Sequence, residues 1–369
     1  MRKFLVAGFL GSALLFFVVD TVFGQSENSW KSIATIAGNG RSDLQVKDGL
    51  ATDVSISNPF GVEPTRDGDL IIASYDRHVI CQLNTAKGSL TRIAGTGKTG
   101  FQAQSGSALG IPMHFPHEVR TDSKGRIFVA DTSNHCVGMI DPSTGQWNRV
   151  AGTGTAGFSG DSGPASAAAM NEAYSIAVDG SQLFIADLKN QRIRLVDLQT
   201  NLISTIAGDG RKAKPLDGGF ANEQALEGPR SLAVDKDNLW IVQREGNSVW
   251  RIDRSTGKIY HVAGTGRKGF SGDGGKATTA ELNGPKGIAV DPGRFVYIAD
   301  TENHAIRRVD LASGVIDTVV GSPNGEKGFN GDGPNVTERL LSRPHGVCLL
   351  GDKLIIGDSE NHRVRAVSK

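Results

Sequence analysis

A motif that recurs at an almost constant interval constrains this chain more than any other feature. The full motif reads Pro-x-Gly-Val/Ile, a short apolar strand, Ile-Ala-Asp, Asn-His-x-x-Arg and an Ala-Gly-x-Gly loop. Its copies are spaced by 57, 57, 56, 56 and 59 residues and start at Pro59, Pro116, Ala173, Pro229, Pro285 and Pro344. A period of that length with four short strands in each copy predicts a closed ring of blades, a β-propeller.

The fifth copy shows the expected strands most clearly. Four runs of five or six residues, rich in Val, Ile, Tyr and Phe, fall at 287–291, 295–300, 305–310 and 315–320. The connections within the copy are hairpin-sized, so we expect the four strands to form one antiparallel meander. No stretch of the chain has the apolar spacing of a long amphipathic helix, which predicts an all-β fold.

The two ends of the chain predict how the ring closes. The last copy, from Pro344 onward, supplies three strands and then the chain stops. Residues 32–38 read Ser-Ile-Ala-Thr-Ile-Ala-Gly and closely match the fourth strand of the third copy, residues 202–208. We therefore expect this N-terminal strand to complete the last blade, which gives six four-stranded blades and removes two exposed sheet edges.

The first 24 residues differ in character from the repeats. Arg2 and Lys3 precede an apolar run from residue 4 to residue 19, and the small residue Gly24 follows. This resembles a secretory signal peptide cleaved before Gln25. The alternative is an uncleaved anchor, although the run is shorter than the ~20 residues that span a bilayer. The expected organisation is a signal peptide at 1–24, one propeller at 25–369, and a secreted, extracellular or periplasmic protein.

Charge and cysteine content exclude some partners. The chain has 40 Lys plus Arg and 39 Asp plus Glu, and removing the first 24 residues takes away two basic residues and one acidic residue. The remaining neutral chain offers no electrostatic attraction for nucleic acid or an anionic membrane surface. Cys81, Cys136 and Cys348 fall at non-equivalent repeat positions. We expect three buried thiols, with a disulfide left open by an oxidising compartment.

The signature after the second strand resembles a known repeat. Residues 303–310 read Asn-His-Ala-Ile-Arg-Arg-Val-Asp and residues 361–365 read Asn-His-Arg-Val-Arg, each after an Ile-Ala-Asp or Ile-Gly-Asp strand. These segments are similar to the NHL repeat, and the likeness covers residues 32–369. The resemblance implies a six-bladed propeller. Its family includes binding platforms for proteins or RNA and a few enzymes, so fold alone does not give the function.

Two repeated features contain residues typical of metal ligands. The Asn-His turn places one histidine in each of four blades, namely His78, His135, His304 and His362. Metal ligands must converge within ~2 Å of one ion, so we expect these histidines to bond their own backbone instead.

The second feature is the Gly-Phe-Ser/Asn-Gly-Asp loop that joins one blade to the next. It contributes three carboxylates that are candidate calcium ligands, Asp161, Asp273 and Asp332. Each loop offers one carboxylate and calcium takes six to eight oxygens, so a structural role for Asp and Gly in the turns is the expected one. The preceding Phe158, Phe270 and Phe329 are expected to hold the loops down, and the Ala-rich segments that follow to form a helical turn.

One repeat position points toward the predicted channel and varies among the copies. Just before the innermost strand, at the mouth of the central channel, it holds Phe60, His117, Tyr174, Arg230, Lys286 and His345. Glu118 adds a carboxylate beside His117. Two histidines, a tyrosine, an arginine and a lysine around one axis form a candidate anion or metal site.

A second resemblance concerns this mouth. The segments Pro-His-Glu-Val from Pro116 and Pro-His-Gly-Val from Pro344 look like the zinc-histidine motifs of the peptidyl-α-hydroxyglycine α-amidating lyases. The resemblance implies His117 and His345 as zinc ligands, with Tyr174 as base and Arg230 nearby. A third histidine is expected between them, where the fourth copy instead has Arg230.

The sequence thus favours a secreted propeller that acts as a binding or scaffold module. The expected partner is an extracellular or cell-envelope protein, or a small anionic ligand at the channel mouth. The alternative is a metal-dependent lyase or lactone hydrolase that uses His117 and His345, with Arg230 or Lys286 holding a substrate carboxylate. Cofactors are left open between none, zinc and calcium.

Overall fold

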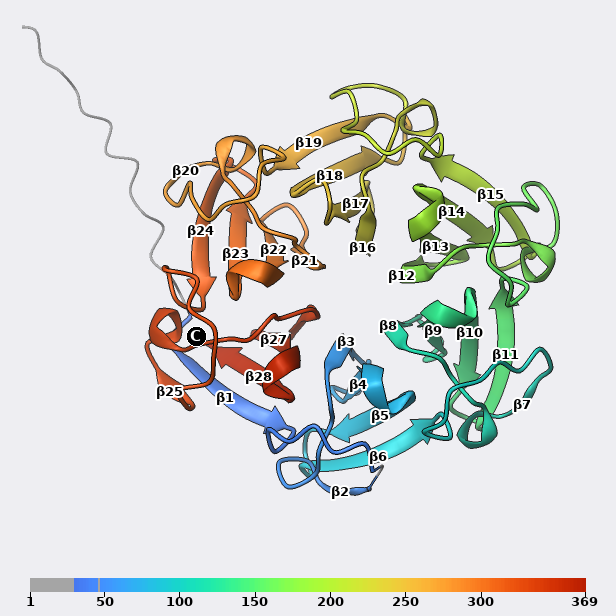
Figure 1. The fold of residues 1–369 in the computed structure, drawn as a ribbon, viewed down its shortest axis with the longest axis horizontal. Coiled ribbons are helices and arrows are strands. Elements are labelled where there is room, and N and C mark those ends of the chain that lie inside the picture. Colours follow the sequence, from blue (N-terminus) through green and yellow to red (C-terminus); the bar gives the residue numbers. More distant parts are fainter. Residues whose placement is uncertain (1–29, 46) are drawn as a thin grey trace, which may run out of the picture.

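Six antiparallel sheets surround a central axis in the computed structural model (Figure 1). The structure describes residues 30–45 and 47–369, so the predicted signal peptide at 1–24 lies outside the described residues. The described helices are single 3-10 turns of three residues, and none of them could cross a membrane. The prediction of an all-β, six-bladed propeller is confirmed.

Each blade is a meander that runs from the axis outward. The innermost strands are β3 (Pro59–Pro64), β8 (Pro116–Thr121), β12 (Ala173–Asp179), β16 (Pro229–Val234), β21 (Gly287–Asp291) and β26 (Val347–Leu350). The second strands are β4 (Leu70–Ser74), β9 (Ile127–Asp131), β13 (Gln182–Asp187), β17 (Asn238–Gln243), β22 (Phe295–Asp300) and β27 (Lys353–Asp358).

The outer half of each blade contains the remaining strands. The third strands are β5 (Val79–Asn84), β10 (Cys136–Asp141), β14 (Arg192–Asp197), β18 (Ser248–Asp253), β23 (Ala305–Asp310) and β28 (Arg363–Ser368). The fourth strands are β6 (Ser89–Ala94), β11 (Gln146–Ala151), β15 (Leu202–Ala207), β19 (Ile259–Ala263), β24 (Val315–Val320) and β1 (Ser32–Ala37). Four blades gain a two-residue fifth strand from the incoming loop: β2 (Gly49–Leu50), β7 (Gly106–Ser107), β20 (Gly275–Lys276) and β25 (Gly333–Pro334).

The ring closes with strands from both ends of the described chain. β1 pairs antiparallel with β28, in a register that places Ser32 opposite Ser368 and Ile33 opposite Val367. In Figure 1 the blue β1 lies beside the red β28 in the sixth blade. The predicted closure is therefore confirmed. It removes a free edge from the first and the last strands of the described propeller.

The core lies between neighbouring blades rather than inside one of them. Every residue of β4 and of β9 is buried, because each sheet is covered on both faces. One apolar cluster joins Phe128 of blade two to Ile185 of blade three. The three cysteines are buried free thiols, as predicted, so no disulfide links the described blades.

In the part of the chain that the structure describes, ten 3-10 turns connect the strands and fall into two groups. Five follow the second strands: η1 (Tyr75–Arg77), η3 (Thr132–Asn134), η5 (Leu188–Asn190), η8 (Thr301–Asn303) and η10 (Ser359–Asn361). Five lie in the loops that lead into a blade, including the predicted turns of the Ala-rich segments: η2 (Ala108–Gly110), η4 (Ala165–Ala167), η6 (Ala221–Glu223), η7 (Ala277–Thr279) and η9 (Val336–Glu338).

The histidine of the Asn-His turn links one blade to the next. In all four blades it has a left-handed backbone, with φ between 51° and 55°. The Nδ1 atom of His304 accepts a hydrogen bond of 3.1 Å from the backbone N–H of Arg343, which precedes the innermost strand of the next blade. His78, His135 and His362 make the same bond to Phe115, Glu172 and Asn58. The role is structural as predicted, but the expected bond to the histidine's own backbone was wrong.

Candidate functional site

The repeated histidine bond also positions the channel mouth. The residue whose N–H donates this bond has a positive φ, 45° at Asn58 and at Arg343 and 54° at Phe115, a conformation that L residues adopt only when held. The mouth residue lies two positions later, so the turn of one blade sets the direction of the next blade's mouth side chain. We define the channel mouth by these six residues: Phe60, His117, Tyr174, Arg230, Lys286 and His345.

Aromatic rings pack against one another over half of the channel mouth. The ring of Phe60 stacks on His345 with centroids 3.8 Å apart and lies 4.7 Å from the ring of His117. His117 in turn contacts Tyr174 edge to face at 3.7 Å. Tyr75, from η1, stacks on Phe60 at 4.3 Å. The structure thus brings together residues from blades one, two, three and six that are far apart in sequence.

The cations complete the mouth on the other side. The guanidinium of Arg230 lies 4.5 Å from the ring centroid of Tyr174, within cation–π range. Lys286 Nζ donates to His345 Nε2 at 3.0 Å. Contacts therefore run from Arg230 through the rings to Lys286. Between the two cations the connection runs instead through ion pairs of Glu245, Arg244 and Glu302.

The hydrogen bonds of His345 fix its protonation state. Its Nδ1 lies 2.9 Å from the carbonyl oxygen of Arg343, which can only accept, so Nδ1 carries the hydrogen. Nε2 is then the acceptor for Lys286. Burial, followed by the charge of Lys286, lowers the pKa of His345 well below its ordinary value. Burial and then Arg230 do the same to the pKa of His117, so both imidazoles are neutral at pH 7.

The two histidines do not fit a zinc site. Their ring centroids lie 6.5 Å apart, and Lys286 already occupies the lone pair of His345 Nε2. Within the part of the chain that the structure describes, no group of three His, Cys, Asp or Glu side chains could hold a metal ion. Zinc in proteins takes four ligands, three of them from the protein in catalytic sites. The position of the missing histidine holds Arg230, whose charge opposes a bound cation.

The environment of Lys286 gives its amine unusual properties. Burial, then the neighbouring charge of Arg343, lowers the pKa of Lys286 to about 7, against the opposing charge of Glu302 at 3.7 Å. Its side chain is only 8% exposed. Glu302 is shared, because it also accepts from Arg343 at 2.7 Å and from Arg244 at 3.3 Å. Lys286 is therefore a cation with an incomplete counter-charge.

A belt of ion pairs around the mouth was missed by sequence reasoning. Arg230 pairs with Glu245 at 2.9 Å, Glu245 with Arg244 at 3.1 Å, and Arg343 with Glu360 at 2.8 Å. The repeat contained a pattern that could have predicted these ion pairs. The second residue after the second strand is acidic in four blades, at Asp76, Glu245, Glu302 and Glu360.

Glu118 does not join the mouth. Its carboxylate lies deeper in the channel, where it accepts from Arg120 at 2.5 Å and from Ser175 at 3.4 Å. Arg120 was not singled out in the sequence. It provides the cation that draws Glu118 away from His117.

The three candidate calcium carboxylates are paired with buried arginines. Asp161 accepts from Arg194 at 2.8 Å and Asp332 from Arg365 at 2.9 Å, and Asp273 pairs with Arg307 in the same way. Each of these arginines is the last residue of the Asn-His-x-x-Arg signature or its variant. Phe158, Phe270 and Phe329 lie over the guanidinium groups of the same blades. The loops therefore hold their blades together through ion pairs.

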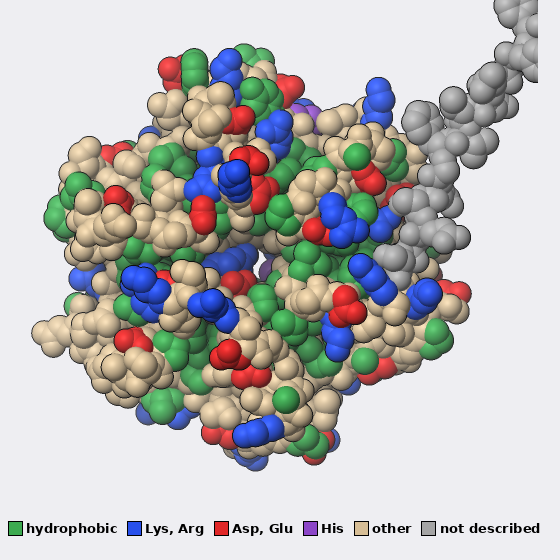
Figure 2. Space-filling view, turned by 180° about the vertical axis from the view of Figure 1, so that it is seen from behind, with side chains coloured by type: hydrophobic (Ala, Val, Ile, Leu, Met, Phe, Trp, Pro, Cys, Tyr) green, Lys and Arg blue, Asp and Glu red, His purple; other side chains and the backbone are tan. Residues whose placement is uncertain are grey.

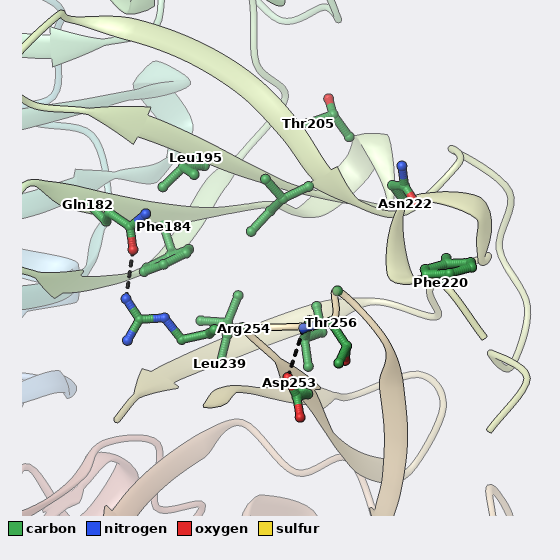
Figure 3. A pocket seen from close by; sticks show the side chains of 13 residues that line it. Gln182, Phe184, Leu195, Thr205, Phe220, Asn222, Leu239, Asp253, Arg254 and Thr256 are labelled. Carbon is green, nitrogen blue, oxygen red and sulfur yellow. Dashed lines mark hydrogen bonds between the residues drawn. The ribbon is translucent and has the colours of Figure 1, made fainter. Parts of the chain in front are cut away.

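Another concave region lies between blades three and four. It has a volume of about 430 Å³ and is lined by apolar and polar residues in similar number, among them one cation, Arg254 (Figure 3). That guanidinium donates to Gln182 Oε1 at 2.6 Å and pairs with Asp179 at 2.7 Å. The charge of Arg254 is thus compensated at hydrogen-bond distance, whereas Lys286 at the mouth has its carboxylate, Glu302, only at 3.7 Å.

Two family models match this chain. The NHL repeat matches residues 113–138 and 341–366, and the teneurin NHL domain matches residues 260–330. NHL repeat-containing protein 2 of Gallus gallus is 26% identical over 288 residues, which are 69% of this chain and 39% of the relative. Teneurin-4 of Mus musculus is 26% identical over 94% of this chain and 14% of its own length. The chain thus spans about two fifths of the former and a smaller part of the latter.

Solved structures share the fold at low identity. An auxiliary nutrient binding protein from Bacteroides ovatus has a TM-score of 0.68 at 16% identity, over 92% of this chain and 77% of that one. A streptogramin B lyase has a TM-score of 0.53 at 16% identity, over 92% of this chain and 99% of that one. Identities this low support the architecture and leave the chemistry to the residues of this chain.

Proposed function

The chain belongs to the NHL-repeat six-bladed β-propellers, and from this premise we propose that it is a binding module for a small carboxylate-bearing molecule at the channel mouth. The fold itself supports a binding or scaffold role. One observation about the site supports the ligand class. Arg230 and Lys286 are cations of adjacent blades that have different counter-charges, Glu245 at 2.9 Å from Arg230 and Glu302 only at 3.7 Å from Lys286.

The chemistry of the mouth suits an anion with an apolar or aromatic part. A carboxylate between Arg230 and Lys286 accepts charge-assisted hydrogen bonds from both, which are stronger than neutral ones. The edges of the aromatic rings then contact the remainder of the ligand, because His345 and Tyr75 cover the two faces of Phe60. Neutral His117 adds a polar group without adding charge. Small-molecule sites commonly combine apolar walls with a few such polar groups.

Isothermal titration calorimetry tests this proposal. Phenylacetate is the probe, and its uncharged analogue 2-phenylethanol is compared with it at pH 6.5. We expect phenylacetate to bind and 2-phenylethanol to bind at least ~tenfold more weakly, because the alcohol lacks the charge. Lys286→Met weakens the binding of phenylacetate ~tenfold, the effect of losing one charge-assisted hydrogen bond. Arg267→Ala, which removes an exposed cation with a 79% exposed side chain, leaves it unchanged. Equal binding of both probes, or no binding at all, overturns the proposal.

The rival function is the metal-dependent lyase or lactone hydrolase that the sequence left open, with His117 and His345 as its metal ligands. Elemental mass spectrometry of the purified protein separates the two functions. About one zinc per chain, lost in a His117→Ala, His345→Ala double variant, supports the rival. Zinc content below a tenth of an equivalent, together with phenylacetate binding, supports the binding module.

We further propose that the protein is exported and that its site meets an extracellular or cell-envelope ligand. The charged start and apolar run of residues 1–19 support this. N-terminal sequencing of the protein recovered from its native cells is the test. A mature N-terminus at Gln25 supports export, and an intact Met1 in the cytosolic fraction contradicts it.

A further inference from the structure

The opposite end of the central channel forms a second, chemically different cavity. It has a volume of about 230 Å³, and its walls come from the innermost strands of all six blades. Seen from behind, the disc is hollowed at its centre (Figure 2). We call this cavity the vestibule. Its wall is aliphatic in blades three to six, at Ala177, Val178, Ala233, Val234, Ile288, Ala289, Val290, Val347 and Leu349.

The polar side of the vestibule is formed by Glu63 and Arg120. Arg120 spans the channel, since it pairs with Glu118 at 2.5 Å in blade two and donates to the carbonyl oxygen of Leu232 in blade four at 3.2 Å. Its distance to Glu63 Oε2 is longer, 3.8 Å. Two carboxylates thus share one guanidinium, and the group of three has one negative charge in excess when all are ionised.

The two oxygens of Glu63 have unequal partners. Oε1 accepts from the backbone N–H and the hydroxyl of Thr121, at 3.1 and 3.3 Å. Oε2 makes no hydrogen bond to any residue in the described ranges and has Arg120 only at 3.8 Å. Burial raises the pKa of Glu63 to about 7 despite Arg120 and Thr121. An incompletely compensated carboxylate oxygen therefore faces an aliphatic cavity.

We propose that the vestibule binds a small primary alkylammonium ion. The ammonium group donates to Glu63 Oε2, and its alkyl chain lies against the valines and alanines of blades three to five. Carbonyl groups on the inner edges of the innermost strands are further acceptors, as Leu232 shows by accepting from Arg120. Drug-sized ligands occupy roughly 300–1,000 Å³. The vestibule is smaller than that, so the amine is a short one.

Charge complementarity selects this occupant. A carboxylate ligand is repelled by Glu63, and a neutral alcohol leaves its charge uncompensated. A divalent metal ion requires several oxygen ligands, and Arg120 competes for the same carboxylates. The site is independent of the channel mouth, because Arg120 and Glu118 lie between the two ends.

The test uses n-butylammonium chloride as the probe in calorimetric titrations of the protein at pH 8, with n-butanol and butyrate as comparisons. We expect saturable binding of the amine only. Glu63→Gln keeps an acceptor for Thr121 and weakens amine binding at least ~tenfold, the effect of losing one charged hydrogen bond. Ala233→Leu fills the vestibule without touching Glu63 and also removes binding. Glu338→Gln, which removes an exposed carboxylate in an outer loop, has no effect.

Cys348 supplies a readout that does not depend on heat signals. It lines the vestibule and is 7% exposed, and burial raises the pKa of its thiol well above the ordinary value. Bound amine slows the reaction of Cys348 with a small methanethiosulfonate, measured by peptide mass spectrometry, and phenylacetate does not. Amine binding that is equal in the original protein and in Glu63→Gln, or butanol that binds as well as butylammonium, overturns the proposal. The proposed binding of carboxylates at the mouth would stand in either case.

Discussion

The two ends of the central channel are built on the same six strands and have opposite chemistry. The mouth presents Arg230, Lys286 and stacked rings, whereas the vestibule presents Glu63 and aliphatic walls. In both places each blade contributes residues at equivalent positions. The difference teaches that the repeat fixes where side chains point, and that function depends on which residue each blade places there.

Arg120 separates the two ends. Replacing it with Met leaves Glu63 and Glu118 buried without a cation, and breaking such a buried pair costs ~3–5 kcal/mol of unfolding free energy. Urea denaturation measures the loss. Adding Glu118→Gln restores part of it, because one uncompensated carboxylate is then removed. Unchanged stability in Arg120→Met contradicts the charge assignment of the channel.

A double substitution of the cations at the mouth tests whether the mouth and the vestibule bind their ligands independently. Arg230→Ala with Lys286→Met lowers phenylacetate affinity ~100-fold, as expected from losing two charge-assisted hydrogen bonds. Butylammonium affinity is unchanged. Calorimetric titrations of the same preparation with each of the two probes show whether only the phenylacetate affinity falls. Parallel loss of both ligands indicates a general structural defect instead of two sites.

The two ends respond to pH in opposite directions. Lys286 has a pKa of about 7 and carries its charge below it, so phenylacetate binding weakens as pH rises from 6 to 8. Glu63 also has a pKa of about 7 but is charged above it, so butylammonium binding weakens as pH falls over the same range. Each affinity changes up to ~tenfold per pH unit beyond the pKa. Titrations at three pH values test both signs, and parallel trends contradict the account.

The smallest expected effect concerns the blade-to-blade histidine. His304→Ala removes the acceptor for the N–H of Arg343 and lowers the unfolding free energy by ~1 kcal/mol. Because that segment leads to His345, which accepts from Lys286, phenylacetate affinity falls a few-fold. The control is His261→Ala on the outer strand β19, which removes a bond to the carbonyl oxygen of Gly264. It lowers the unfolding free energy and leaves phenylacetate affinity unchanged.

The sequence predicted the scaffold well because the scaffold repeats. Strand positions, ring closure by residues 32–37, and the buried thiols followed from periodicity and apolar patterning. The hydrogen-bond partner of His304 could not be predicted in this way. The bond reaches a residue of the next blade, and no local sequence pattern indicates a contact between residues so far apart in the chain. Glu302 was missed because its role depends on Lys286 and Arg343 converging from other segments.

Blade two shows the limit of reasoning from the repeat. Where blade three has the buried Arg194, blade two has Gly138, and the Trp147 ring lies where a β-carbon of residue 138 would be. Asp131 therefore lacks the arginine partner that Asp187 has, and burial raises its pKa to about 7. The departure was visible in the sequence, but the tryptophan that fills the space was identified only from packing.

The most direct test of the central claim is a crystal structure of the protein with phenylacetate bound at pH 6.5. The account predicts the carboxylate between Arg230 and Lys286, with the phenyl ring against Phe60 or Tyr174. Density for phenylacetate beside Arg254 in the outer groove, or for a metal ion between His117 and His345, would contradict it.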